Sequence, residues 1–213
     1  MGDLSDLNEI QTWESDEGAH AGSMDRWQGV KSALRDTIET VLLTLMIFFL
    51  VRAFIQNFRI EGTSMEPNLH NGQYLIINKL AYHLHPPARG DIIVFRYPHN
   101  PKRDFIKRVI GLPGEEVEVR RGRVFINGQE LKEPYPLKAG AYSWGPQILG
   151  PDEYFVLGDN RNNSSDSHSW GALPRANIIG KAWVCYWPPR YWGLIRHPSA
   201  DRGGSRGTAY RYR

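Results

Sequence analysis

Ser64 lies in a short turn-forming stretch, Arg59-Ile-Glu-Gly-Thr-Ser-Met-Glu-Pro-Asn-Leu69, between an apolar segment and a run of β-type sequence. The glycine two residues before it and the proline three residues after it are typical of tight turns. A serine held on such a fixed backbone can present its hydroxyl as a nucleophile. Because the pattern also fits an ordinary turn residue, the rest of the sequence has to supply a base.

A lysine is the best candidate for that base, since the seven histidines show no triad arrangement and three of them fall in Pro-rich, loop-like sequence. In a strand, alternation places Lys107 on the same apolar face as Phe105 and Val109. A buried lysine must lose its proton or find a partner, and a lysine with a lowered pKa can act as a general base. The alternative is an edge-strand lysine whose amine reaches solvent.

The segment from Gly158 to Gly171 is dense in Asn, Asp and Ser, which can satisfy the backbone of their own loop. It also holds carboxylates that could pair with Arg108 and hydroxyls that could orient an amine. Its spacing does not match the calcium-binding EF-hand loop. The chain has no HExxH motif and no paired Cys/His spacing, so we expect no metal and no cofactor.

Together these segments resemble the ordered motifs of bacterial type I signal peptidases, and the resemblance covers roughly residues 35–190. The matching segments are Ser64–Pro67, Arg89–Phe95, Lys107–Gly114, Gly158–Arg161 and Asp166–Ser167. Their order, their spacing and the preceding apolar segment all fit. The joint match is specific, whereas each motif alone would be weak.

The resemblance implies that Ser64 is the nucleophile and Lys107 the general base of a Ser–Lys dyad, a variant of the triad. It places Ser164 where a serine hydrogen-bonds and orients the lysine. Asp159 and Asp166 fall where acids pair with the arginine that follows the base, here Arg108.

By resemblance alone, three residues match positions that line shallow pockets for small substrate residues: Phe58, Ile60 and Ile106. The main-chain N–H of Ser64 would form part of the oxyanion hole. Some members add a serine hydroxyl where this chain has Gly62. The second hydrogen-bond donor of the oxyanion hole is therefore not identified by the resemblance. The chain departs from the family pattern at two further positions. Asn68 stands at a position often held by threonine, and His168 stands where an arginine commonly pairs with the acid at Asp166.

The element that precedes this region reads as a membrane span, because residues 41–51 are almost wholly apolar and the helical pattern extends from about 37 to 58. About 22 residues are enough to cross a bilayer. The alternatives are a buried core helix and a cleaved signal peptide, but no small-residue cleavage site follows the apolar run. The flanking basic residues favour an inside N-terminus only slightly.

The expected organisation is an acidic disordered tail (1–26), a helix with the span (27–58), a β-rich catalytic domain (59–195) and a basic disordered tail (196–213). Short β-branched runs bounded by Gly and Pro predict a mainly β, antiparallel, barrel-like fold after one transmembrane helix. Outside residues 1–25 the chain has a surplus of basic residues, which suits lipid headgroups or nucleic acid.

The resemblance therefore implies a membrane-anchored serine endopeptidase that removes signal peptides from exported preproteins. The expected partners are these preproteins and the bilayer, without nucleic acid; the protein is expected to be a monomer with its catalytic domain outside the cytoplasm. A cytosolic self-cleaving repressor-type Ser–Lys protease is a second hypothesis, which the apolar span disfavours. A non-catalytic membrane-tethered β module is a third.

Overall fold

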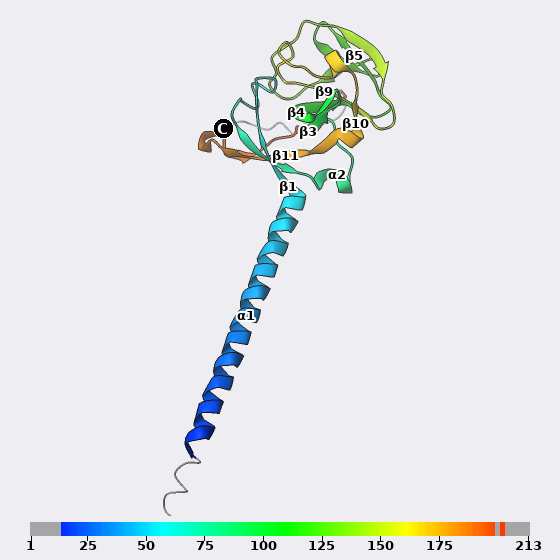
Figure 1. Cartoon of the computed structure of the whole chain (residues 1–213). Helices are drawn as coiled ribbons and strands as arrows, with labels where there is room; N and C mark the ends of the chain where they lie inside the picture. The colour runs from blue at the N-terminus through cyan, green and yellow to red at the C-terminus, as the bar shows by residue number, and fades with distance from the viewer. Residues whose placement is uncertain (1–13, 199–200, 203–213) are drawn as a thin grey trace, which may run out of the picture. The chain divides into compact units, whose positions relative to one another are not determined.

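The computed structural model describes residues 14–198 and 201–202, with side chains from residue 33 to residue 198 and at residues 30 and 31. The chain divides into two units, residues 1–52 and residues 53–213, and each is described by itself (Figure 1). The first consists of the helix α1 (Glu14–Phe54), whose last turn enters the second unit. Of the two expected tails, residues 1–13 and most of the C-terminal segment lie outside the described residues.

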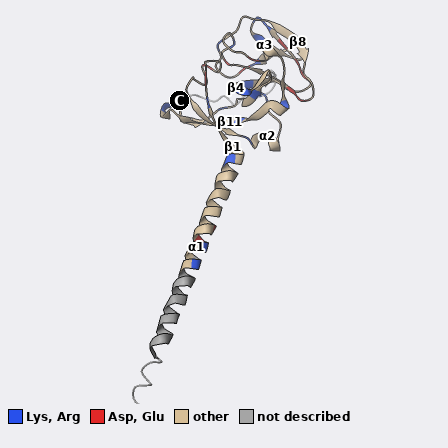
Figure 2. Ribbon diagram, viewed as in Figure 1, with Lys and Arg blue, Asp and Glu red and all other residues tan. Residues whose placement is uncertain are grey.

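Helix α1 contains one stretch, Ala33–Phe54, that is long and apolar enough to cross a membrane. Its 22 residues rise about 33 Å along the axis, which matches the hydrocarbon thickness of a bilayer. Figure 2 shows its charged residues near its start and at its end, with uncharged residues between them. All side chains from residue 33 to residue 53 are exposed, which argues against a buried core helix.

The helix differs from the expected one at both ends. It begins at Glu14, so residues 14–26 are helical rather than disordered, and it ends at Phe54 rather than at residue 58. Residues Ile55–Arg59 instead form strand β1, which pairs antiparallel with β2 (Tyr74–Asn78). Residues 55–58 contain no Gly or Pro that would end a helix, but the β2 edge offers them backbone hydrogen bonds and sheet packing, which override helical propensity.

The second unit is the expected antiparallel β domain, built from two sheets (Figure 1). In spatial order the first sheet contains β1, β2, β11 (Ile178–Trp187), β3 (Ile92–Tyr97), β4 (Asn100–Gly111), β9 (Glu153–Leu157) and β10 (Leu173–Pro174), with β12 (Gly193–Leu194) beside β11. The second contains β13 (Asp201–Arg202), β7 (Gln129–Lys132), β6 (Arg123–Ile126), β5 (Glu116–Arg120) and β8 (Trp144–Ile148). The short helices are α2 (Ala81–Leu84), α3 (Ser167–Trp170) and the 3-10 turns Arg175–Asn177 and Pro189–Tyr191.

The longest strand, β4, links the surface to the core. Its first five residues are exposed and its last six are buried, so it enters the protein interior near residue 106. One core cluster packs this part of β4 against β2, β3 and β11 and includes Met65 and Leu69 from the Ser64 turn. A second cluster joins the end of β4 to β5, β6 and β9. The core therefore fixes both the turn and the middle of β4.

The chain beyond β12 remains attached to the β domain. His197 Nδ1 accepts a hydrogen bond from the main-chain N–H of Ile92 at 3.0 Å, and its Nε2 lies 2.8 Å from the carbonyl oxygen of Ala182. These bonds join it to β3 and β11. The segment expected to be disordered from residue 196 is thus ordered at His197, because its ring finds partners on two strands.

Candidate active site

The Ser64 turn is anchored on both sides. Between β1 and β2, the main-chain N–H of Ile60 donates to Gln73 O at 2.8 Å, which closes the loop at its base. Inside it, the amides of Asn68 and Leu69 bond back to Met65 O at 3.0 and 2.9 Å. Met65 is 1% exposed and holds the turn in the core. The backbone that carries the Ser64 hydroxyl is therefore fixed, as the Gly/Pro pattern predicted.

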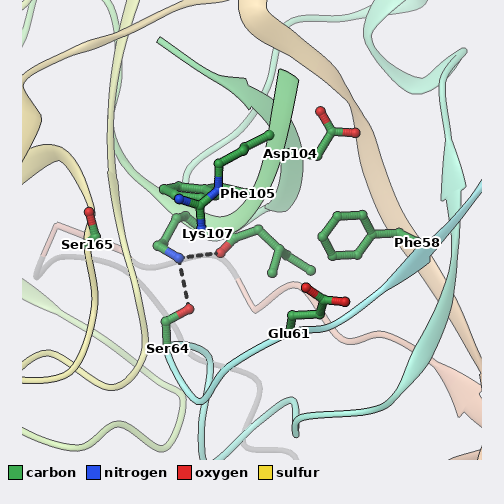
Figure 3. Close-up of a pocket in the computed structure, with 9 residues that line it drawn as sticks. Phe58, Glu61, Ser64, Asp104, Phe105, Lys107 and Ser165 are labelled. Atoms are coloured by element: carbon green, nitrogen blue, oxygen red, sulfur yellow. Dashed lines mark hydrogen bonds between the residues drawn. The ribbon is translucent and has the colours of Figure 1, made fainter. Parts of the chain in front are cut away.

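Lys107 points from β4 at this hydroxyl (Figure 3). Its Nζ lies 2.8 Å from Ser64 Oγ and 2.9 Å from Ile106 O. It lies 5.4 Å from the ring centroid of Phe105, two residues earlier, which agrees with the predicted strand face. The residue is 4% exposed, so the alternative of a lysine that reaches solvent is wrong.

Burial decides the protonation of this amine. Because the charged form is poorly solvated in the interior, burial lowers the pKa of Lys107 from its ordinary value to about 8. The negative charges of Asp166 and Asp159 act in the opposite direction and raise the pKa of Lys107. About one tenth of the molecules therefore carry a neutral amine at pH 7, and a neutral amine can accept the proton of a hydroxyl.

Asp159 pairs with Arg108 as the resemblance implied. The arginine donates from Nε and Nη2 to the two carboxylate oxygens at 2.8 and 2.7 Å, and both side chains are buried. Its Nη1 donates to Gly90 O at 3.0 Å. Such a bidentate pair has strict geometry, so it fixes the strand segment that carries Lys107.

Asp166 does not pair with Arg108, which corrects the expectation. Its Oδ2 accepts the main-chain N–H of Gly158 at 2.9 Å, and its Oδ1 accepts from the main chain and Nδ1 of His168 at 3.3 and 2.5 Å. It is the N-cap of α3. The physical reason is that the main-chain N–H of Gly158 and the α3 residue His168 already hold both oxygens of Asp166.

Ser164 is close to the dyad residues but does not bond to the lysine. Its Oγ is buried and has no hydrogen-bond partner among the described residues. A Cβ added to Gly158 would lie 2.2 Å from this oxygen and 2.5 Å from Ser64 O. Gly158 therefore lets the two serine segments approach each other, and an orienting role for Ser164 remains a prediction.

A cleft of about 190 Å³ lies beside the Ser64–Lys107 pair (Figure 3). Two of the three expected pocket residues, Phe58 and Ile106, line it, whereas Ile60 is 2% exposed and belongs to the core. The other residues that line it are Glu61, Arg103, Asp104, Phe105 and Ser165. Within the described part of the chain no group of His, Cys, Asp and Glu side chains could hold a metal ion.

Two asparagines that sequence reasoning did not single out fix the Ser64 turn. Asn160 donates its main-chain N–H to Ser64 O at 2.9 Å and its side-chain Nδ2 to Thr63 O at 3.2 Å. Asn163 Nδ2 donates to Thr63 Oγ1 at 2.7 Å. The only signal in the sequence was the density of Asn in this loop. The main-chain N–H of Ser64 makes no hydrogen bond within the described residues, so it can point at a substrate.

Comparisons with known proteins show which proteins this chain is similar to. The family model described as signal peptidase, peptidase S26, matches residues 34–187. A protein named Signal peptidase I from Leptolyngbya laminosa is 47% identical over 175 residues, which cover 78% of this chain and 86% of that protein. Probable signal peptidase I-2 from Synechocystis sp. is 44% identical over 163 residues, covering 74% and 75% of the two chains. Signal peptidase I P from Bacillus subtilis subsp. natto is 34% identical over 176 residues, covering 77% and 95%.

Proposed function

Because this chain belongs to the signal peptidase family of serine endopeptidases, peptidase S26, we propose that it cleaves N-terminal signal peptides from exported preproteins through a Ser64–Lys107 dyad. The observation that carries the proposal is the 2.8 Å separation of Lys107 Nζ from Ser64 Oγ beside an open cleft. Burial of a lysine in an apolar strand is costly, and a buried lysine with a lowered pKa is what a general base requires.

The reaction follows from the positions of these atoms. Neutral Lys107 takes the hydroxyl proton as Ser64 Oγ attacks the scissile carbonyl carbon, and the carbonyl oxygen becomes an oxyanion. The free main-chain N–H of Ser64 donates to this oxyanion. When the carbon–nitrogen bond breaks, Lys107 returns the proton to the leaving amine. Water then attacks the Ser64 ester with Lys107 again as base, which releases the signal peptide and restores the serine.

Small substrate residues next to the scissile bond are expected from the resemblance to signal peptidases. Phe58 and Ile106 give the cleft an apolar wall that would contact such residues. Ile60 supports this wall from the core rather than touching the substrate.

The apolar helix gives the enzyme a membrane anchor. Ser64 follows Phe54, the last helical residue, by ten positions, and a chain of that length extends at most about 35 Å. A preprotein whose signal peptide is held by the same bilayer thus meets the dyad at a high effective concentration. The catalytic domain faces the extracytoplasmic side, where exported chains emerge, and the enzyme acts as a monomer.

The test is cleavage of a preprotein by the full chain purified in detergent. The parent is expected to release the signal peptide, whereas Ser64→Ala and Lys107→Ala are expected to be inactive while remaining folded. Lys102→Ala is the matched control, because Lys102 is an exposed lysine on the same strand. Undiminished cleavage by both dyad variants would refute the dyad, and a folded but inactive parent would favour the non-catalytic binding module.

A further inference from the structure

Asn68 joins three separate parts of the chain around the candidate active site. It lies four residues after Ser64 in the same turn. Its Nδ2 donates to Asp159 Oδ2 at 2.8 Å and to Pro136 O at 2.7 Å. One amide group therefore connects the turn of the nucleophile, the acid beside the base, and the connection between β7 and β8.

The bond to Asp159 reaches the base side of the dyad. Asp159 is fully buried and binds Arg108, the residue after Lys107, through both of its oxygens. Its charge also raises the pKa of Lys107. Because Asn68 bonds to the same carboxylate, a displacement of the turn would strain the ion pair that holds the lysine segment. The turn and β4 are thus tied together by a route other than the Ser64–Lys107 contact itself.

The bond to Pro136 belongs to a strap formed by residues 136–138. Lys138 Nζ donates to Glu66 Oε2 at 2.6 Å, which is a second contact between the strap and the Ser64 turn. The strap backbone also bonds to the acid loop, since the N–H of Lys138 donates to Asp159 O at 2.9 Å and the N–H of Arg161 donates to Lys138 O at 3.0 Å. The strap, which leads into β8 of the second sheet, therefore holds the turn against the loop of Asp159.

We propose that Asn68 is a positioning residue that sets the distance between the Ser64 hydroxyl and the Lys107 amine, and that both of its N–H groups are needed. The inference rests on the proposed function, because it gives Asn68 a part in that reaction. It also gives a meaning to the departure from threonine. A threonine hydroxyl has one donor hydrogen, whereas an amide has two, so only the amide can satisfy both acceptors.

The test compares Asn68→Thr with Asn68→Leu in the full chain. The leucine has nearly the shape of asparagine and donates nothing, so we expect kcat to fall about tenfold. The threonine keeps one donor for the charged acceptor, so we expect a fall of about threefold. KM should stay close to the parent value in both variants, because Asn68 does not line the cleft. Asn177→Ala is the matched control, since Asn177 Nδ2 bonds to the carbonyl oxygen of Arg96 without a contact to the site.

The outcomes separate a positioning role from a merely structural one. A graded loss of kcat at constant KM, with the melting temperature of Asn68→Thr close to that of Asn177→Ala, supports the inference. Parent-like kcat in Asn68→Leu, equal losses in both variants, or a loss confined to KM would overturn it. The same ranking is measured with a p-nitrophenyl ester, whose acylation of Ser64 needs the dyad but not recognition of a signal peptide. If the parent hydrolyses the ester but does not cleave the preprotein, the proposed substrate is wrong. The effect of the Asn68 variants on ester hydrolysis still tests this inference.

Discussion

The pH dependence of kcat/KM tests the buried lysine most directly. With the pKa of Lys107 at about 8, about one tenth of the molecules carry the neutral amine at pH 7 and about nine tenths at pH 9. The structure therefore predicts a rise of about tenfold between these pH values, followed by a plateau. An ordinary solvated lysine would give a rise of about a hundredfold over the same interval and no plateau.

The assay is steady-state cleavage of a preprotein in detergent, with a cleavage region free of groups that titrate in this interval. Asp166→Asn adds an internal comparison. Removing the charge of Asp166 removes an interaction that raises the pKa of Lys107, so the rising limb should move to lower pH. Asp152→Asn, which removes an exposed carboxylate, should leave the limb in place. A limb that continues upward through pH 10 in the parent, or that moves upward in Asp166→Asn, would refute the account of the base.

Three further predictions concern the groups around the dyad. Asp159→Ala leaves the guanidinium of Arg108 buried without its acid, which should cost about 3 kcal/mol or more of folding free energy and lower the melting temperature strongly; an unchanged melting curve would contradict a buried pair. Gly158→Ala places a methyl carbon 2.2 Å from Ser164 Oγ, so we expect loss of both activity and thermal stability, and a parent-like enzyme would show that the two segments are less tightly packed. His168→Arg places a permanent positive charge beside the carboxylate of Asp166, which caps α3. We expect higher activity or a higher melting temperature at alkaline pH; no change at any pH would contradict this expectation.

Much of the fold followed from local patterns. The apolar run predicted the membrane-spanning stretch, and the β-branched runs between Gly and Pro predicted an antiparallel β domain. Asn127 and Gly128 between β6 and β7 both have positive φ, which is typical of an Asn-Gly hairpin turn. The predicted end of the helix was wrong by four residues, because residues 55–58 are compatible with either helix or strand. Pairing with the edge of β2 decides for the strand.

Local sequence patterns were enough to predict which residues can carry chemistry: a serine on a fixed turn, a lysine on an apolar strand face, and a loop rich in acids and amides. These are properties of neighbouring residues, so periodicity and turn chemistry reveal them. Which of these groups lie close together depends on the packing of the strands. The tertiary structure assigned Asp159 to Arg108 and Asp166 to the α3 cap, where backbone N–H groups of Gly158 and His168 bind the carboxylate of Asp166. It also gave Asn68 its two acceptors, 68 and 91 residues away along the chain, and contacts at such separations depend on how the strands pack.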